Sequence, residues 1–281
     1  MDWSKAKTIL IVAFIITNIL LVHAIIGERP EAEPTIKDDF IEDVVRLLKD
    51  KNISVATQIP KDIPYLNTMI VRYENINIEE LNRSYFNNRG IIKYNEDGLG
   101  EITGKDESIL VMNNRLIIYE NRKDEEVYKN IDRDKAIQLS EEFIEKGKFD
   151  RSDMKLTFIK EERGIFYLEY SKIYNDVLVE RTFTNIQVDK RGVRRFERLW
   201  LVTQDLGETE IYIGTAPKSI LTLLGMREAY GKTIMDISLC YYFDPQKHEY
   251  LEEPGETKQG KAVPAWRVQF ADGYRVFIDE Y

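Results

Sequence analysis

Few side chains in this sequence could carry out covalent or metal chemistry. The chain contains one cysteine, Cys240, and two histidines, His23 and His248, so it can form neither an internal disulfide nor a thiolate metal cluster. A catalytic triad or a histidine-based zinc site would have to be built around His248, which lies in a polar turn. Cys240 lies in an apolar segment with no nearby cation, which favours a buried, unreactive thiol.

The short motifs of catalysis and nucleotide binding are also missing from the sequence. It contains no GxSxG, HExxH, GxxxxGK[ST] or GxGxxG pattern. Carboxylates occur in short runs such as Glu141-Glu142, which usually form solvated faces, although a pair of catalytic carboxylates brought together by the fold stays open. We therefore predict a protein that is not an enzyme and has no cofactor and no metal.

Aromatic side chains gather in two regions, 166–174 and 241–266. Alternation along a strand sends some of these rings into the core and others outward, and exposed tyrosine and tryptophan favour a protein interface. Tyr174, Tyr242 and Trp266 are therefore candidates for an outer interface. Packing in the core is the alternative, because a sheet covered by helices needs large apolar residues.

The composition is that of a folded protein with an acidic surface. Hydrophobic residues make up 43% of the chain, enough to bury a core. The formal charge is −9, and because residues 1–26 contribute +1, the rest of the chain carries −10. Nucleic-acid binding needs clustered cations, so we predict no nucleic-acid partner.

Residues 9–26 form an apolar run without a formal charge when His23 is neutral. As a helix this run would be about 27 Å long, close to the ~30 Å hydrocarbon core of a bilayer. A cleavable signal peptide is the main alternative, but the run exceeds the usual length and no small-x-small cleavage site follows it. We predict an uncleaved transmembrane helix at 9–26, a cytoplasmic N-terminus at 1–8 and a linker at 27–37.

The residues around this run predict its orientation. Lys5 and Lys7 precede it and an acidic segment follows it, so the N-terminus is expected in the cytoplasm and the C-terminal part outside, in a cell membrane crossed once. Trp3 fits an anchor at the membrane interface.

One stripe of the predicted membrane helix carries a polar amide. The stripe consists of Ile11, Phe14, Asn18 and Leu21. Asn18 on this stripe favours packing against a partner helix, and the alternative is that its amide bonds to its own backbone.

Beyond the linker, helix and strand patterns predict an α+β fold with helices lying on antiparallel sheets. A first extracytoplasmic subdomain, 38–125, would begin with an amphipathic helix at 38–51. Its strands are expected at 68–73, 91–94, 101–103, 109–112 and 116–119. The pairs Asp97-Gly98 and Asn113-Asn114 predict two hairpin turns.

A second extracytoplasmic subdomain, 126–281, would contain two more units of a helix followed by a sheet. Asp132 is a suitable N-cap for a helix that ends at Gly147. Strands are expected at 155–160, 165–172, 181–189 and 193–203, and, after a helix that begins near 215, at 233–243, 262–270 and 274–279. Residues 132–203 and 215–281 thus have the order of an internal repeat, without a strict sequence period.

Several segments of this chain are similar in sequence to one known family. They are residues 1–9 (MDWSKAKTI) with Phe14 and Asn18, Asp134-Lys135-Ala136, the 170–175 stretch and residues 262–267 (AVPAWR). In these segments, and in the layout of an anchor followed by outer α+β units, the chain resembles the YycI (WalI) family. The region 75–119 is the least similar.

The resemblance implies a non-catalytic regulator of the YycFG (WalKR) two-component system. Members of that family act with a sister protein, YycH, on the sensor histidine kinase YycG (WalK), which controls cell-wall metabolism in Gram-positive bacteria. For this chain it implies a kinase and a YycH-like protein as partners, contacted through the stripe defined above. The order of elements is also similar to PepSY modules, so an anchored binding or protease-inhibitory module is the alternative. A cell-wall hydrolase or transferase is a third interpretation, which is disfavoured because the sequence offers few possible nucleophiles or metal ligands.

Overall fold

The structure is a computed structural model of the 281-residue chain, and it describes residues 7, 11–18, 36–61, 65–95, 98–245 and 259–279. The chain divides into two compact units, Met1–Lys37 and Asp38–Tyr281, and each is described by itself.

In the first unit, residues 11–18 are helical. Among the residues that the structure describes, no helix is both long and apolar enough to cross a membrane. This finding contradicts the transmembrane helix predicted for residues 9–26, of which 9–10 and 19–26 lie outside the described residues.

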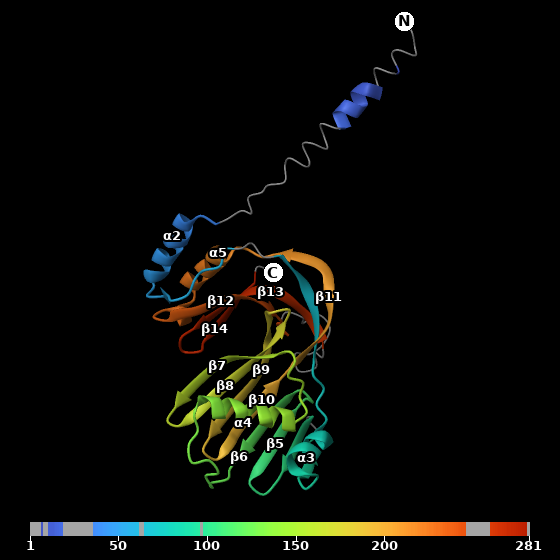
Figure 1. The fold of residues 1–281 in the computed structure, drawn as a ribbon, viewed down its shortest axis with the longest axis vertical. Coiled ribbons are helices and arrows are strands. Elements are labelled where there is room, and N and C mark those ends of the chain that lie inside the picture. The colour runs from blue at the N-terminus through green and yellow to red at the C-terminus, as the bar shows by residue number, and fades with distance from the viewer. Residues whose placement is uncertain are drawn as a thin grey trace. The chain divides into compact units, whose positions relative to one another are not determined.

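The second unit combines helices and strands, in agreement with the predicted α+β class (Figure 1). Its helices are α2 (Asp38–Lys49), α3 (Ile78–Phe86), α4 (Arg133–Lys146), α5 (Ala216–Ile220), η1 (Leu221–Gly225) and η2 (Arg227–Ala229). Its strands are β1 (Ser54–Val55), β2 (Tyr65–Tyr73), β3 (Ile91–Tyr94), β4 (Leu99–Thr103), β5 (Glu107–Met112), β6 (Leu116–Asn121), β7 (Met154–Glu162), β8 (Ile165–Tyr174), β9 (Val177–Asp189), β10 (Gly192–Leu199), β11 (Leu201–Tyr212), β12 (Thr233–Tyr242), β13 (Gln259–Phe270) and β14 (Arg275–Ile278).

Within the described residues, fourteen strands form one connected sheet, whose main order is β11-β2-β13-β12-β9-β10-β6-β5-β4-β3. Strand β9 lies in the middle of this order, between β12 and β10. Its residues Leu178, Val179 and Glu180 pair in parallel with β12, whereas its later residues pair with β10. Both parts of β9 also pair with β8. We call β3–β8 and β10, with α3 and α4, the α4 lobe, and β1, β2 and β11–β14, with α2, α5, η1 and η2, the α2 lobe.

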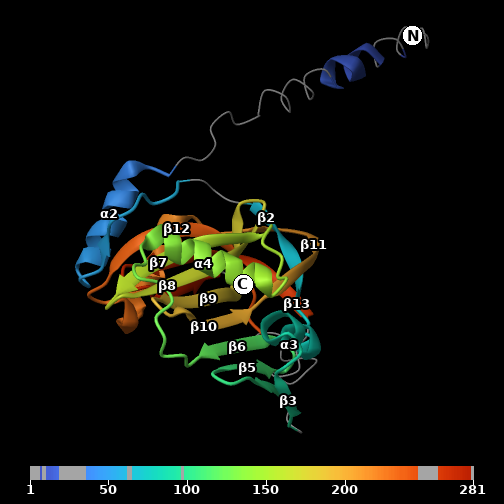
Figure 2. The ribbon, with the colours of Figure 1, turned by 60° about the horizontal axis from the view of Figure 1, so that its bottom comes forward.

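Helix α4 lies across the strands of the α4 lobe and covers one face of them (Figures 1 and 2). Its apolar residues recur at the helical period, so Ala136 and Ile144 point into the core. There they join Leu168 on β8, Ile186 on β9 and Phe196 on β10, which lie opposite one another in register. Because side chains alternate along a strand, this core uses one face of the sheet and leaves the residues between to the other face.

The predicted N-cap of α4 gives a test of this local structure. The side chain of Asp132 accepts a hydrogen bond from the backbone N–H of Lys135 at 2.8 Å. We expect Asp132→Ala to lower the free energy of unfolding by about 1 kcal/mol, measured by urea denaturation, because the helix loses its cap. Glu145→Ala, on the exposed side of the last turn of α4, is the control and should cause no loss. Equal losses in the two variants would contradict the role of the cap.

The α2 lobe has a core of its own under helices α2 and α5. Val44 and Leu48 of α2 are buried in one cluster with Trp266 and Phe270 of β13. The indole Nε1 of Trp266 donates a hydrogen bond to the backbone oxygen of Gly214 at 2.6 Å, so the polar edge of the ring is satisfied inside the core.

The strand pairings of both predicted hairpins are confirmed, since Ile91 pairs with Thr103 and Ile109 pairs with Tyr119. Asp97, in the first predicted turn, lies outside the described residues. The predicted strand 193–203 is interrupted at Trp200, where β10 ends before β11 begins. The expected boundary near residue 125 is crossed by strand pairing, because β6 pairs with β10 and β2 pairs with β11 and β13. The tandem arrangement of separate sheets is therefore replaced by one sheet that both halves of the sequence share.

Helix α3 was not predicted from the sequence. Asn77 caps it by accepting a hydrogen bond from the N–H of Glu80 at 3.0 Å, and Leu81 and Tyr85 bury one of its faces. A helix of nine residues shows too few turns for its period to stand out between two strand-rich regions.

Candidate functional site

The sheet of the α4 lobe has one face under α3 and α4 and, within the described residues, no helix on its other face (Figure 2). On β8 the side chains of Phe166, Leu168 and Tyr170 are buried on the helix side. Tyr167 and Glu169 lie between them and therefore point to the helix-free face. We call this side of the sheet the open face.

Two rows of polar side chains cross the open face over β8, β9 and β10. In the first row, Asn185 of β9 pairs in register with Glu169 on one side and with Glu197 on the other. In the second row, Gln187 of β9 lies between Tyr167 and Arg195. Neighbouring strands are about 4.8 Å apart, so side chains within a row are within reach of one another.

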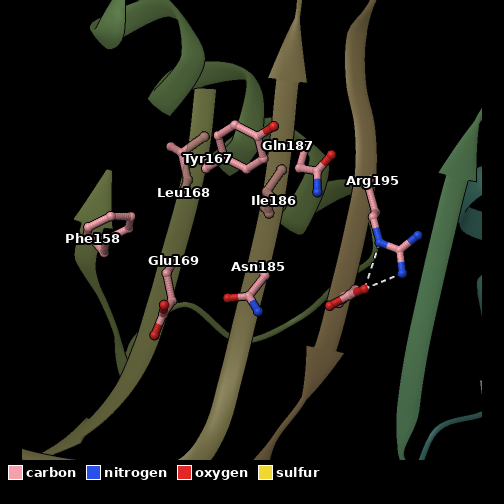
Figure 3. Close-up of a pocket in the computed structure, with 9 residues that line it drawn as sticks. Phe158, Tyr167, Leu168, Glu169, Asn185, Ile186, Gln187 and Arg195 are labelled. Carbon is pink, nitrogen blue, oxygen red and sulfur yellow. Dashed lines mark hydrogen bonds and ion pairs between the residues drawn. The ribbon is translucent and has the colours of Figure 1, made fainter. Parts of the chain in front are cut away.

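A cavity of about 220 Å³ lies over these two rows (Figure 3). Phe158 of β7 closes it at one side, and the aromatic ring of Tyr167 stands over the second row. The lining therefore combines two rings with amides, carboxylates and one guanidinium group. Such a lining suits a ligand that has both an apolar part and a polar end.

The charged groups at the cavity are paired with one another. The guanidinium of Arg195 donates to Glu197 Oε1 at 2.7 Å and to Glu120 Oε1 at 2.7 Å. Glu169 Oε1 is paired with Arg275 of β14, which reaches the α4 lobe from the α2 lobe. The second oxygens of Glu169 and Glu197 have no partner among the described residues. The side-chain oxygen of Asn185 is shielded from solvent and also has no hydrogen-bond partner among them.

Arg275 connects the cavity with a buried ion cluster between the two lobes. Its Nη1 lies 3.6 Å from Glu180 Oε2, and Arg267 Nε lies 2.8 Å from Glu180 Oε1. Arg267 also donates to Asp236 Oδ2 at 3.0 Å. The side chains of Glu180 and Arg267 are each only 3% exposed. A chain of charge contacts thus runs from the open face to the pairing of β12 with β13.

Backbone geometry explains why a glutamate is buried at this place. Between Val179 and Thr184, β9 bulges away from β8, and Arg181 within this bulge has φ of 69°, in the left-handed region. The bulge lets the first part of β9 pair with β12 and the second part with β10. Glu180, next to Arg181, is thereby turned into the interior, where burial raises its pKa and the Arg267 and Arg275 guanidiniums oppose this rise.

Cys240 lies in β12 next to this cluster and is fully buried. Burial raises the pKa of its thiol well above the ordinary value, and the nearby Glu180 carboxylate adds to this effect. The expectation of a buried cysteine is confirmed, and its raised pKa keeps the thiol protonated and unreactive. Within the described residues, no group of three or more histidine, cysteine, aspartate or glutamate side chains could hold a metal ion.

The three residues predicted for an outer interface differ in exposure. Trp266 is 2% exposed and Tyr242 is 8% exposed, so the structure places both in the interior and corrects their assignment to an exposed surface. Tyr242 stacks on Phe277 with ring centroids 4.7 Å apart and accepts a hydrogen bond from Arg181 at 2.9 Å. Tyr174 is half-buried at the end of β8, and its interface role stays a prediction.

The predicted membrane stripe is described in part. Ile11, Phe14 and Asn18 are exposed on the helix of residues 11–18, and Lys7 is exposed as well. The amide of Asn18 donates to the backbone oxygen of Phe14 at 2.9 Å, which is the alternative raised for it from the sequence. Trp3, Lys5 and Leu21 lie outside the described residues.

The residues of the open face were missed by sequence reasoning. Tyr167, Glu169, Asn185, Gln187 and Arg195 alternate with buried apolar positions, and this alternation was the signal that could have found them. The alternation shows that the polar side chains of one strand share one face of that strand. It does not show which residues of different strands lie opposite one another, because register depends on the turns and bulges.

Comparisons with known proteins indicate the class of fold. No known protein family matches the sequence, and no curated protein matches it. A solved structure of an uncharacterized protein from Eubacterium rectale is similar with a TM-score of 0.50 and 12% identity, covering 84% of this chain and 94% of that one.

The fold is also similar to that of YycH from Bacillus subtilis. This match has a TM-score of 0.50 and 15% identity, and it covers 80% of this chain and 56% of that chain. The YpeB C-terminal domain of Bacillus megaterium matches with a TM-score of only 0.37 and 13% identity. The chain thus has a YycH-like fold.

Proposed function

We propose that this chain is a non-catalytic regulatory module that acts outside the cell membrane by binding partner proteins. The proposed partners are a sensor histidine kinase of the YycG (WalK) type, which controls cell-wall metabolism, and a YycH-like sister protein. The sequence resemblance to YycI and the YycH-like fold both support this function. A PepSY-like binding or protease-inhibitory module stays the alternative prediction.

The observation that carries the proposal is the open face of the α4 lobe. It presents aromatic rings, amides and paired charges from neighbouring strands around a half-open cavity. Because Arg195, Glu197 and Glu169 already neutralise one another or Arg275, these groups are arranged for recognition and not for proton transfer. Aromatic and arginine side chains of this kind dominate the energetics of protein interfaces.

Co-purification tests the proposal. The full-length chain is co-expressed with a kinase of this type and a YycH-like protein, and complexes are isolated through a tag on the chain. We expect both partners to be recovered and kinase autophosphorylation to change in their presence. Tyr167→Ala on the open face should reduce recovery at least about fivefold, since a single aromatic interface residue is often worth more than 1 kcal/mol.

The matched control is Tyr65→Ala, which removes a 59% exposed ring from β2 in the α2 lobe. Recovery of the partners with this variant should stay at the wild-type level. If neither partner is recovered with the wild-type chain and kinase autophosphorylation is unchanged, the proposed function is wrong. An equal loss of partner recovery in both variants would show that the interface does not lie on the open face.

A further inference from the structure

The first row of the open face contains an amide oxygen without a hydrogen-bond donor, on a strand flanked by two carboxylates. The oxygen of Asn185 is turned towards β8, the strand that carries Glu169 (Figure 3). Glu197 lies in register on the other side of Asn185. Carboxylates accept hydrogen bonds and cannot donate them, so the row brings together two carboxylates and an unpaired amide oxygen. A shielded acceptor without a donor is unfavourable, and a ligand that donates would satisfy it.

The charges around the cavity balance in number, but the arginines do not pair with every carboxylate equally. Arg195 is shared between Glu197 and Glu120, and Arg275 is shared between Glu169 and Glu180. Glu120 and Glu180 have further partners in Arg122 and Arg267. Glu169 and Glu197, the two carboxylates in the first row, each rely on one shared arginine.

The rest of the lining fits the body of such a ligand. The ring of Phe158 lies beside the first row, and the ring of Tyr167 lies over the second. Methylene groups pack against rings of this kind, and an ammonium group is attracted to their faces. A cavity of about 220 Å³ has room for an unbranched alkyl chain of a few carbons.

We propose that the Glu169–Asn185–Glu197 row binds a primary ammonium group at the end of an alkyl chain, as in the side chain of lysine. The ammonium group has three N–H donors, and the row offers it the unpaired Asn185 oxygen and the neighbouring carboxylates as acceptors. This inference adds to the proposed function a specific element of recognition: a lysine of the partner protein enters the cavity. Arg195 and Arg275 remain in their ion pairs and hold the two carboxylates in place.

The test is an NMR titration of the full-length protein with small probes, which needs neither the kinase nor the sister protein. The probes are Nα-acetyl-lysine methylamide, its uncharged analogue Nα-acetyl-norleucine methylamide, and pentylamine. We expect the lysine probe to shift the side-chain amide signals of Asn185 and Gln187 saturably, and the norleucine probe to leave them unchanged. Pentylamine binding as tightly as the lysine probe would identify a site for free amines, while weaker binding would identify a site for a lysine within a peptide.

Two substitutions at one position separate recognition from folding. Asn185→Leu keeps the size of the side chain and all ion pairs, and should weaken binding of the lysine probe about tenfold, the loss expected for one hydrogen bond to a charged group. Asn185→Asp adds a charge to the row and should tighten binding. Gln204→Leu, an exposed amide on β11, is the control and should bind as the wild type does.

The inference is overturned if the norleucine probe binds as well as the lysine probe, or if Asn185→Leu binds the lysine probe unchanged. If Asn185→Leu does not fold, Glu197→Gln takes its place, because Arg195 keeps its pair with Glu120 in that variant. Should the kinase and sister protein bind while no ammonium probe does, the proposed function stands and the lysine site is wrong. If an ammonium probe binds while neither the kinase nor the sister protein does, the lysine site stands and those two proposed partners are wrong.

Discussion

Replacing Arg267 by methionine is expected to lower the free energy of unfolding of the full-length protein by about 3–5 kcal/mol at pH 7. Arg267 is 2% exposed, and its Nε lies 2.8 Å from Glu180 Oε1. Methionine fills much of the same space but leaves the Glu180 carboxylate buried with only Arg275, at 3.6 Å, as a cation. Urea denaturation followed by circular dichroism measures the loss. Arg83→Met, at an exposed position of α3, should change stability by less than about 0.5 kcal/mol.

The loss in Arg267→Met should depend on pH in a defined direction. Burial raises the pKa of Glu180 above its ordinary value of 4.5, and Arg267 opposes the rise. A raised pKa means that the folded state holds this proton more tightly than the unfolded chain does. The resulting stability is fully present below pH 4.5 and is lost as the pH rises through the folded-state pKa.

Without Arg267 the pKa of Glu180 rises further, so the deficit of the variant should be smaller at pH 5 than at pH 8. The double variant Arg267→Met/Glu180→Gln has no titrating group at this position, so its deficit relative to the single variant Glu180→Gln should be nearly the same at the two pH values. If the single variant shows the same deficit at both pH values, the buried glutamate is not the cause.

Replacing Trp266 by alanine should be as damaging, with a loss of about 3–5 kcal/mol in the free energy of unfolding. Trp266 is among the largest fully buried side chains, and it belongs to the same core cluster as Val44 and Leu48 of α2. Trp266→Phe keeps most of the buried ring but loses the hydrogen bond to Gly214, so it should lose about 1–2 kcal/mol. Denaturation with urea, monitored by far-ultraviolet circular dichroism, gives both values.

Tyr212→Ala is the matched control for this series, because its ring is 53% exposed on β11. Its loss should stay below about 1 kcal/mol, as expected for an exposed aromatic pair with Tyr65. If Trp266→Ala were as stable as Tyr212→Ala, the ring would lie at an exposed surface, which is one of the two alternatives that the sequence left open.

Local elements of this fold could be predicted from the sequence because their signals are local. Asp132 marks the start of α4, and Asn113-Asn114 lies in the turn between β5 and β6. Asp272-Gly273, in the turn between β13 and β14, carries the same kind of local signal. In each case one or two residues specify the backbone conformation, such as the positive φ of Asn113, Asn114 and Gly273.

The candidate site could not be predicted because it depends on register between strands. Glu169, Asn185 and Glu197 are separated by 16 and 12 positions, and the bulge in β9 and the shift between Val193 and Arg195 bring them into one row. Arg275 joins the site from a strand 106 positions after Glu169. Charge pairs at such separations leave no periodic pattern in the sequence. The apolar run at 9–26 is a strong local signal that misled the prediction. Hydropathy alone predicted a membrane span that the structure does not support.

The position of β2 between β11 and β13 has a consequence for the order of folding. The α4 lobe is built mainly from residues 76–199, so its contacts can form as soon as that stretch of chain has been synthesised. The α2 lobe needs β1 and β2 from residues 54–73 together with β11–β14 from residues 201–278. We therefore expect the middle of the chain to acquire protease resistance first. Residues 54–73 should stay cleavable until β13 arrives, which a time course of limited proteolysis during cell-free synthesis would record.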